Sequence, residues 1–269
     1  MPDDLVIASY GAGTNSTAFL IEMVRRGEKV DAILFADTGG ERPGTYAFVA
    51  LFSDWLMARG YPAITIVKKG GRQETLEEDC LRKSMLPSLA YGFKGCSHKY
   101  KIEPQDKFVN NYPPAREAWA AGRKVTKLIG YDMDEPHRAA IPEDAKYTYR
   151  YPLLEWKWGR DECVSAIEEA GLPQPGKSSC FFCPASTKED ILELRKSHPD
   201  LLSRALAMEA AAKESGNLQT INGLGRRLNW GEFIELVGEA EDPTKFILRQ
   251  QAFPEPVPCG CYDGGSEAA

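Results

Sequence analysis

The 269-residue chain lacks any run that approaches the roughly 18 apolar residues needed for a membrane-spanning helix. Its first residues, MPDDLVIASYG, have no basic segment ahead of a short apolar one. This start is typical of a first strand rather than of a secretory signal peptide. We therefore expect a cytoplasmic protein with no membrane partner.

Positive charge is also scarce. The 33 lysine and arginine residues are outnumbered by 39 aspartate and glutamate residues, which gives a net charge of −6. Non-specific nucleic-acid binders draw much of their affinity from neutralised phosphates, so this balance argues against such a protein. The net charge does not exclude a local basic groove at residues 93–107, which include Lys94, His98, Lys99, Lys101 and Lys107. The alternative is a solvated, charged face.

The first third of the chain alternates between short apolar runs and segments with helical spacing. Residues 5–9, 31–36 and 63–67 are apolar runs of strand length, and residues 16–26 and 45–59 repeat apolar positions as helices do. A further strand is expected at residues 124–129. This alternation predicts an α/β fold with a doubly wound, Rossmann-like parallel sheet.

The later part of the chain favours helices. Residues 160–170 and 187–215 have helical patterns, and residues 253–269 begin with prolines and end in small residues. We therefore expect an α/β domain at residues 1–158, a helical region at residues 159–252 and a cysteine-containing tail at residues 253–269.

A glycine-rich turn joins the first expected strand to the first helix. It consists of Ser9, Tyr10, Gly11, Ala12, Gly13, Thr14, Asn15 and Ser16. Glycine lets the backbone approach a bound anion, and a helix start offers unpaired N–H groups and a favourable dipole. The turn is therefore a candidate phosphate site, with an ordinary tight turn as the alternative. It is neither a P-loop nor a dinucleotide fingerprint, because it lacks Gly-Lys-Ser/Thr and has Ser16 where the last glycine would stand.

The cysteines are odd in number and partly clustered. The seven are Cys80, Cys96, Cys163, Cys180, Cys183, Cys259 and Cys261. In a reducing compartment they favour metal or redox chemistry over a disulfide framework. The CxxC at residues 180–183 can hold a metal ion or one edge of a cluster, and a [4Fe–4S] cluster, Zn²⁺ and a redox-active or structural CxxC all remain open. Two cysteines on helical patterns, Cys80 and Cys163, are expected to be buried.

The turn at residues 9–16 resembles the PP-loop of the ATP pyrophosphatases. That superfamily includes phosphoadenosine phosphosulfate reductases and sulfur-transfer enzymes that act on tRNA or DNA. The resemblance implies that residues 9–16 bind ATP and that Ser9 and Ser16 take catalytic roles. The chain departs from the family at Asn15, where Asp is common, and so loses a possible Mg²⁺ contact.

Later segments follow the order of the reductase-like family. Residues 37–46 (DTGGERPGTY) are similar to a segment that lies along the adenosine, which implies nucleotide contacts for Ala36, Asp37 and Thr38 and a catalytic role for Asp37. Residues 130–138 resemble a segment in which Gly130 would contact the nucleotide and Arg138 would bind phosphate or sulfate through its bidentate fork. The stretch YPLLEW at residues 151–156 also resembles the family.

The cysteines fit the family only in part. Cys96, followed by residues 101–104 (KIEP), stands where related reductases have a cysteine. The resemblance implies a cluster or a zinc ion held by Cys96, Cys180 and Cys183, with Cys259 or Cys261 as a further ligand. The Glu-Cys-Gly-Leu-His segment that carries the nucleophile of assimilatory reductases is absent from the chain. The resemblance therefore implies ATP-pyrophosphatase chemistry for this chain more strongly than sulfonucleotide reduction.

The resemblance implies an enzyme that converts ATP to AMP and pyrophosphate with Mg²⁺ and activates an acceptor for sulfur transfer. Its expected partners are an adenine nucleotide, a nucleic-acid acceptor that contacts residues 94–107 and Arg226 and Arg227, a sulfur donor protein and a second copy of the chain in a homodimer. The alternatives are a sulfonucleotide enzyme with small-molecule substrates, in which Arg138 and Lys99 bind sulfate, and a non-catalytic nucleotide- or metal-binding module.

Overall fold

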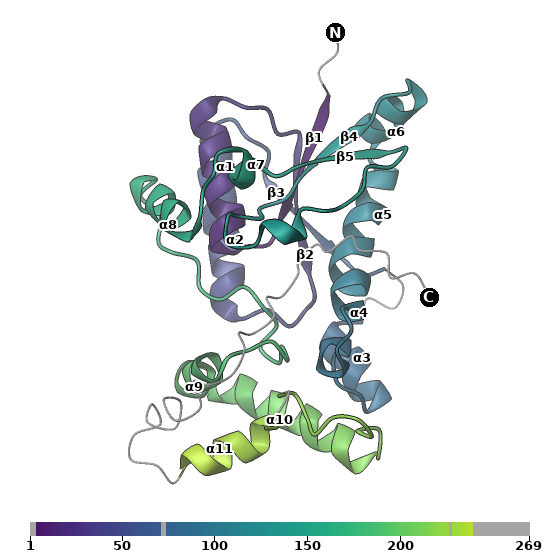
Figure 1. Cartoon of the computed structure of the whole chain (residues 1–269), viewed down its shortest axis with the longest axis vertical. Coiled ribbons are helices and arrows are strands. Elements are labelled where there is room, and N and C mark those ends of the chain that lie inside the picture. The colour runs from purple at the N-terminus through teal and green to yellow at the C-terminus, as the bar shows by residue number, and fades with distance from the viewer. Residues whose placement is uncertain (1–3, 71–73, 226–227, 239–269) are drawn as a thin grey trace.

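A parallel β-sheet is the central feature of the computed structural model, which describes residues 4–70, 74–225 and 228–238 (Figure 1). The strand order is β3-β2-β1-β4-β5. The strands are β1 (Leu5–Tyr10), β2 (Ala32–Asp37), β3 (Ile64–Lys68), β4 (Val125–Leu128) and β5 (Tyr147–Arg150). All four neighbouring pairs are parallel, so the carboxyl ends of the strands meet at one edge. The order reverses between β1 and β4, the place where open α/β sheets bind ligands.

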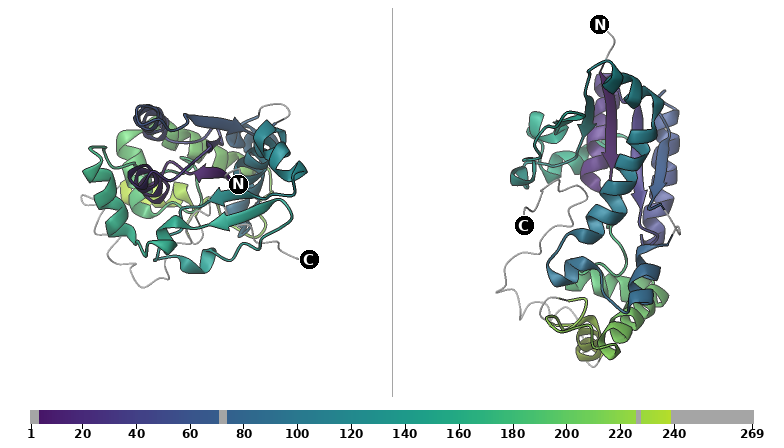
Figure 2. Two further views of the ribbon diagram at one scale, coloured as in Figure 1. Left: turned by 90° about the horizontal axis from the view of Figure 1, so that it is seen from above. Right: turned by 90° about the vertical axis from the view of Figure 1, so that its right-hand side faces the viewer.

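The strands β1 and β2 are covered on both faces, which explains their nearly continuous apolar sequences. Ala8 and Ile33 point into a core shared with α1 (Thr14–Arg26), α2 (Pro43–Met57) and α8 (Arg160–Glu169). Ile7 and Leu34 point the other way, toward α5 (Glu103–Asn111) and α6 (Pro113–Ala120). Alternate residues of each strand therefore pack against opposite helical layers. Figure 2 shows from above the helices on the two faces of the sheet.

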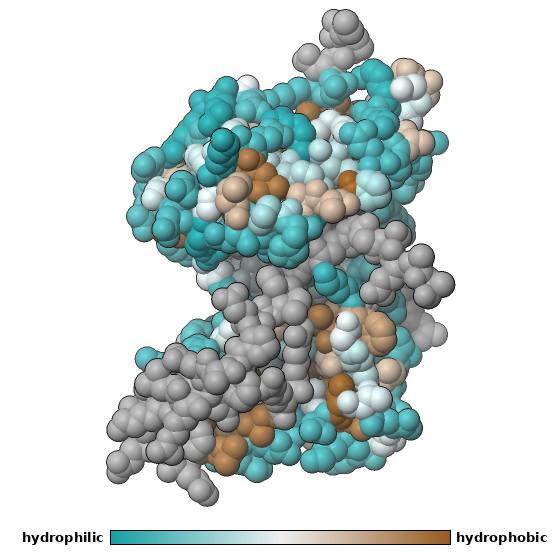
Figure 3. Space-filling view, in the orientation of Figure 1, coloured by the Kyte–Doolittle hydropathy of each residue, from teal (hydrophilic) through white to brown (hydrophobic). Residues whose placement is uncertain are grey.

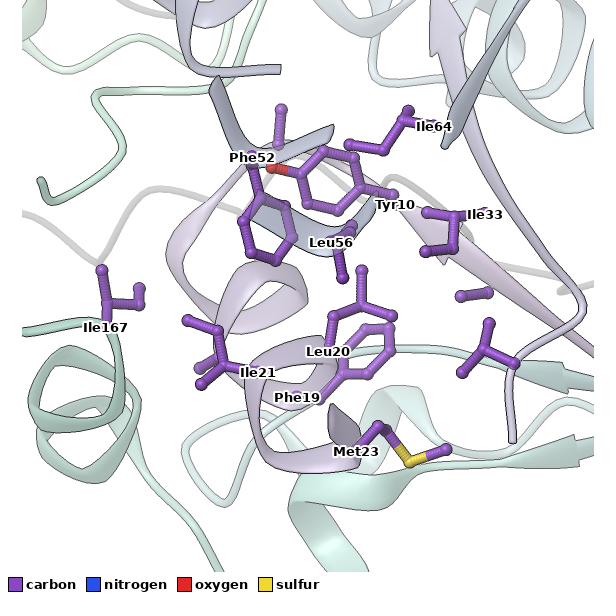
Figure 4. Packing of buried hydrophobic residues seen from close by; sticks show 14 of the residues in the cluster. Tyr10, Phe19, Leu20, Ile21, Met23, Ile33, Phe52, Leu56, Ile64 and Ile167 are labelled. Atoms are coloured by element: carbon purple, nitrogen blue, oxygen red, sulfur yellow. The ribbon is translucent and has the colours of Figure 1, made fainter. Parts of the chain in front are cut away.

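The larger core is built around aromatic rings between the sheet and its helices (Figure 4). The rings of Tyr10 and Phe52 lie 5.5 Å apart, and Phe52 stacks on Phe48 at 6.1 Å. Burial raises the pKa of Tyr10 above its ordinary value, and its hydroxyl lies 3.3 Å from Oγ1 of Thr17. The β1 strand is thus anchored at its last residue, directly before Gly11 of the glycine-rich turn.

A second core lies at the other end of the molecule, where the helices form a separate lobe (Figure 1). Its helices are α3 (Leu76–Lys83), α9 (Lys188–Ser197), α10 (Pro199–Glu214) and α11 (Trp230–Gly238). Glu209 of α10 is buried and accepts hydrogen bonds from the backbone N–H groups of Leu224, Trp230 and Gly231 at 2.7, 3.0 and 2.8 Å. One carboxylate therefore fixes the loop that leads from α10 to α11.

Short elements complete the described part of the chain. They are α4 (Gly95–Ser97), α7 (Pro152–Glu155), the 3₁₀ turns Ser88–Tyr91 and Pro136–Arg138, and the π-helical turn His98–Ile102. Most of the outer face shown in Figure 3 is hydrophilic, with apolar residues gathered in small groups. Within the described ranges, no helix is both long enough and apolar enough to span a membrane.

The structure confirms the expected α/β fold with a parallel sheet and a helical C-terminal part. The strands predicted at residues 5–9, 31–36, 63–67 and 124–129 correspond to β1 to β4. The domain limits stay a prediction. In the structure α8 packs on α1 of the sheet lobe, whereas α3 packs on α10 of the helical lobe.

Candidate functional site

The glycine-rich turn between β1 and α1 is held by its own side chains. Oγ of Ser16 accepts a hydrogen bond from the N–H of Gly11 and donates one to the carbonyl of Gly13, both at 3.2 Å. Ala12 adopts the left-handed conformation with φ of 56°, and α1 begins at Thr14. These contacts order the turn, and the first backbone N–H groups of the helix, which have no intrahelical partners, belong to residues that line a pocket.

A pocket of about 280 Å³ lies in front of this turn. It is lined by Ser9, Gly11 and the residues from Gly13 to Ser16, and across from them by Gly130 and Tyr131 after β4. Tyr10 and Ala12 are buried at 2% and 1% exposure and do not line the pocket. Of the sequence-predicted turn residues, these two therefore turn their side chains into the core.

Gly130 is required by close packing against the turn. A Cβ at this position would lie 2.9 Å from Cδ1 of Phe19 and 3.2 Å from the backbone nitrogen of Ser16. Gly13 is different, because an added Cβ would meet only Cβ of Ser178 at 3.8 Å, an ordinary contact. Close packing thus explains why residue 130 is a glycine. The glycine at position 13 instead leaves room for a side chain beside the pocket.

Three cations face the pocket from other parts of the chain. Arg138 lies over the ring of Tyr131, with 4.4 Å from Cζ to the ring centroid, and pairs with Glu135. Arg160 follows Gly159 at the start of α8, and Lys177 pairs with Asp190. All three line the pocket beside the helix start. Their positive charge and the α1 dipole together favour a polyanionic ligand.

Arg160, Lys177 and Ser178 were missed by the sequence analysis. Oγ of Ser178 donates a hydrogen bond to the carbonyl of Gly11, so this segment is attached to the glycine-rich turn. The available signal was the triplet Gly176-Lys177-Ser178. It was not recognised because it neither follows a strand nor opens a helix, and only the fold brings it to the turn.

Asn15 is fixed by a carboxylate on the neighbouring loop. Its Nδ2 donates a hydrogen bond to Oδ2 of Asp132 at 2.7 Å, and Nη1 of Arg160 lies 3.5 Å from its Oδ1. Asp132 is 4% exposed, and its Oδ1 accepts from the N–H of Asp134. The amide at position 15 therefore connects a buried anion to a pocket cation.

The residues at the end of β2 lie outside this pocket. Oδ1 of Asp37 accepts hydrogen bonds from the N–H of Gly39 and the hydroxyl of Tyr46, both at 2.7 Å, and Oδ2 lies 2.9 Å from Nζ of Lys68. Burial opposes ionisation, but these donors hold the pKa of Asp37 below its ordinary value. Ala36 and Asp37 line neither this pocket nor the one described next.

A second, mostly apolar pocket contains three cysteines. Cys96, Cys180 and Cys183 line it together with Thr38, whose Oγ1 lies 3.1 Å from Sγ of Cys180. The N–H of Cys183 bonds to the carbonyl of Cys180 at 3.0 Å, which closes the CxxC turn. The N–H of Cys96 bonds to Oγ of Ser88 at 2.6 Å. The fold thus brings together three of the predicted metal ligands from distant parts of the sequence.

The donor set suits a thiolate-bound metal. The five described cysteines are free thiols, and three of them meet at one apolar cavity. Within the described residues no group of three or more His, Cys, Asp and Glu side chains is already gathered closely enough to hold a metal ion. Cys259 and Cys261 lie outside the described residues. Burial raises the pKa of Cys80 and of Cys163 to about 12, in agreement with their predicted place in the cores.

The basic stretch does not form one continuous groove within the described residues. Lys99 bonds to Asp79, and Lys101 is buried and lies 3.9 Å from Glu41. His98 lies 3.1 Å from Glu103. Lys94 lines the cysteine pocket. The side chains diverge because the segment is helical, while Arg226 and Arg227 lie outside the described residues.

No protein-family model matches the chain, and no curated protein matches it. Among solved structures, the chain is similar to the U34-tRNA thiolase NcsA from Methanococcus maripaludis with its [4Fe–4S] cluster. The two share 16% sequence identity over 79% of this chain and 74% of the thiolase, with a TM-score of 0.45.

Proposed function

We propose that the protein is an adenylating enzyme of the PP-loop ATP-pyrophosphatase type. The observation that supports this most directly is the pocket at the switch point of the sheet. There an ordered, glycine-rich helix start faces Arg138, Arg160 and Lys177. A triphosphate is the ligand that matches several main-chain donors and three cations in one cavity.

In this proposal the backbone amides of residues 11–16 bind the β- and γ-phosphates. An oxygen of the acceptor attacks the α-phosphorus, the bond from that phosphorus to the bridging oxygen breaks, and pyrophosphate leaves with the electron pair. The cations of the pocket stabilise the charge that collects on the leaving group, so catalysis is mostly positioning and electrostatic stabilisation. Glu135 lines the pocket and fits a ligand of Mg²⁺, which when bound would offset phosphate charge.

The cysteine pocket is the proposed site of a [4Fe–4S] cluster, with Zn²⁺ as the alternative. Cys96, Cys180 and Cys183 would hold it, and Cys259 or Cys261 would be the candidate fourth ligand. If Cys96, Cys180 and Cys183 were the only protein ligands, the cluster would supply an open iron site for a sulfur species, which suits transfer of sulfur to the activated acceptor; a fourth cysteine ligand would close that site. Iron and acid-labile sulfide in anaerobically purified protein would support the cluster, and zinc alone would exclude it.

A nucleic acid is the proposed acceptor, and a sulfur donor protein and a homodimeric state belong to the same proposal. The sulfonucleotide enzyme remains the second candidate, because Arg138 could bind sulfate as well as phosphate. It differs in its product: sulfite released from a sulfonucleotide in the presence of reductant would favour it over adenylation.

The test of the main proposal is to follow ATP labelled at the α-phosphate and, separately, ATP labelled at the γ-phosphate. With RNA or DNA acceptors we expect the γ-label in pyrophosphate and the α-label on the acceptor, from which a sulfur donor should release it as AMP in an amount equal to the pyrophosphate. ADP as the product, or no turnover with any acceptor tested, would contradict the proposal. Gly13→Val is the matching variant, because the site has room for a side chain and the sheet should stay folded while ATP binding is lost.

A further inference from the structure

A separate group of cations surrounds Asp79 on α3, at 6% exposure. Nζ of Lys83 lies 2.9 Å from this carboxylate, and Nζ of Lys99 lies 3.1 Å from it. Burial opposes ionisation, but the hydrogen bonds from both lysines hold the pKa of Asp79 below its ordinary value. The carboxylate is therefore ionised and already shared between two ammonium groups.

A third ammonium reaches the same place from the sheet. Lys69 directly follows β3, and its Nζ lies 3.0 Å from the hydroxyl of Tyr100 and 4.6 Å from the centre of its ring. Nζ of Lys99 lies 5.7 Å from the same ring centre. Burial and then the nearby Lys99 lower the pKa of Lys69. Two ammonium groups are thus held against one buried ring.

The acidic groups around these lysines do not balance them. Besides Asp79, the nearby carboxylate is Glu74, and it accepts two hydrogen bonds from Arg82 at 2.7 and 3.2 Å. Arg82 also bonds to Asp79. The two carboxylates, Asp79 and Glu74, therefore face four cations at the carboxyl edge of the sheet, and such converging positive charge repels itself unless an anion joins it.

We infer that Lys69, Lys83 and Lys99 form a second anion site, which takes a tetrahedral oxyanion such as a phosphate or sulfate group. The site is open to its ligand, since the side chains of Lys83 and Lys99 are 40% and 39% exposed. The anion site adjoins the cysteine pocket. Leu76 lines that pocket and lies on the same helix as Lys83, and Lys101 lines it from the π-helical turn that also carries Lys99. This inference stands apart from the proposed ATP site, which uses none of these lysines.

The test measures binding of inorganic phosphate to the full chain by calorimetry, in the Gly13→Val background so that the ATP pocket contributes least. Lys69→Gln should weaken phosphate binding about tenfold or more, since charged hydrogen bonds contribute that much. Lys69→Arg should keep binding, and Lys213→Gln, on the exposed side of α10, should leave it unchanged. Equal phosphate binding in Lys69→Gln and its parent would overturn the inference, whether or not the protein hydrolyses ATP.

A second measurement identifies the source of the oxyanion. Binding of a single-stranded RNA is compared between Lys69→Gln and Lys213→Gln over a range of salt concentrations. If the affinity for RNA depends less on salt in Lys69→Gln but not in Lys213→Gln, the result would support the site and assign it to a phosphate of the RNA backbone. Unchanged RNA binding together with lost phosphate binding would also support the site, and would assign it to a small-molecule anion. If Lys69→Gln stays folded and alters neither phosphate binding nor the salt dependence of RNA binding, the site does not exist.

Discussion

The side-chain amide of Asn15 lies 2.7 Å from the carboxylate of Asp132 and donates a hydrogen bond to it. An aspartate at position 15, common in the family that the turn resembles, would place two carboxylates at this distance. The neutral amide instead satisfies a buried anion and leaves Arg160 beside the pocket. The departure from the family pattern therefore has a physical reason in this chain.

The first prediction concerns this contact. Asn15→Asp should lower the free energy of unfolding at pH 7 by about 1–3 kcal/mol, because a hydrogen bond is replaced by repulsion between carboxylates. Repulsion raises the pKa of one of them, so the deficit should shrink as the pH falls through that raised value. Urea unfolding at several pH values measures this. The double variant Asn15→Asp/Asp132→Asn should recover most of the loss, and failure to recover would show that the pair is not the cause.

The second prediction concerns Asp37. Its pKa lies below the ordinary value in the folded protein, so its ionisation stabilises the fold above the unfolded-state pKa of about 3.9. This contribution should be lost as the pH falls from there through the folded-state value. Asp37→Asn should therefore reduce the melting temperature at pH 7 and flatten its acid dependence below pH of about 4. An unchanged acid profile would show that Asp37 is not stabilised by Tyr46 and Lys68.

The third prediction separates the geometry of Arg138 from its charge. Arg138→Lys keeps the positive charge but removes the planar fork, so ATP binding should weaken about tenfold or more while the fold persists. Fluorescent-nucleotide titration measures the change. Arg59→Lys is the matched control, because Arg59 also lies over a ring, that of Trp55 at 3.8 Å, but does not line the pocket at the glycine-rich turn. An equal effect of both substitutions would remove Arg138 from the site.

The fourth prediction concerns the thiols. Cys183→Ala should lose most of the bound metal, because one of three pocket ligands is removed. Cys163→Ala should keep it, since Cys163 is fully buried in the sheet core and away from the pocket. Metal content per chain is compared after anaerobic purification. Full metal content in Cys183→Ala would exclude this residue from the ligand set.

Much of the sheet could be predicted from local sequence. The β1 and β2 strands are almost entirely apolar because both of their faces are covered, and the turn after β1 is marked by its glycines. The β5 strand, Tyr147–Arg150, was missed because an edge strand with half-buried polar residues lacks that apolar signal.

The candidate site was likewise predictable from the sequence only in part. The sequence predicted the turn, Gly130 and Arg138 because their segments resemble those of a known family in order, and the structure places them at one pocket. Lys177 and Arg160 belong to the pocket only through the fold, so no local pattern could show them. The lysines around Asp79 were visible as charges, but their convergence depends on the fold, which brings α3, the residue after β3 and the turn His98–Ile102 together.

The segment from Gly176 to Cys183 serves both pockets. Its first three residues line the pocket at the glycine-rich turn, and Cys180 and Cys183 line the cysteine pocket. It is tied down at one end by Ser178 on Gly11 and at the other by Phe181 on Gly40. If a nucleotide binds as proposed, one short backbone segment carries both a cation beside its phosphates and the thiols, so alkylation rates at Cys180 measured with and without ATP would test whether the two pockets are coupled.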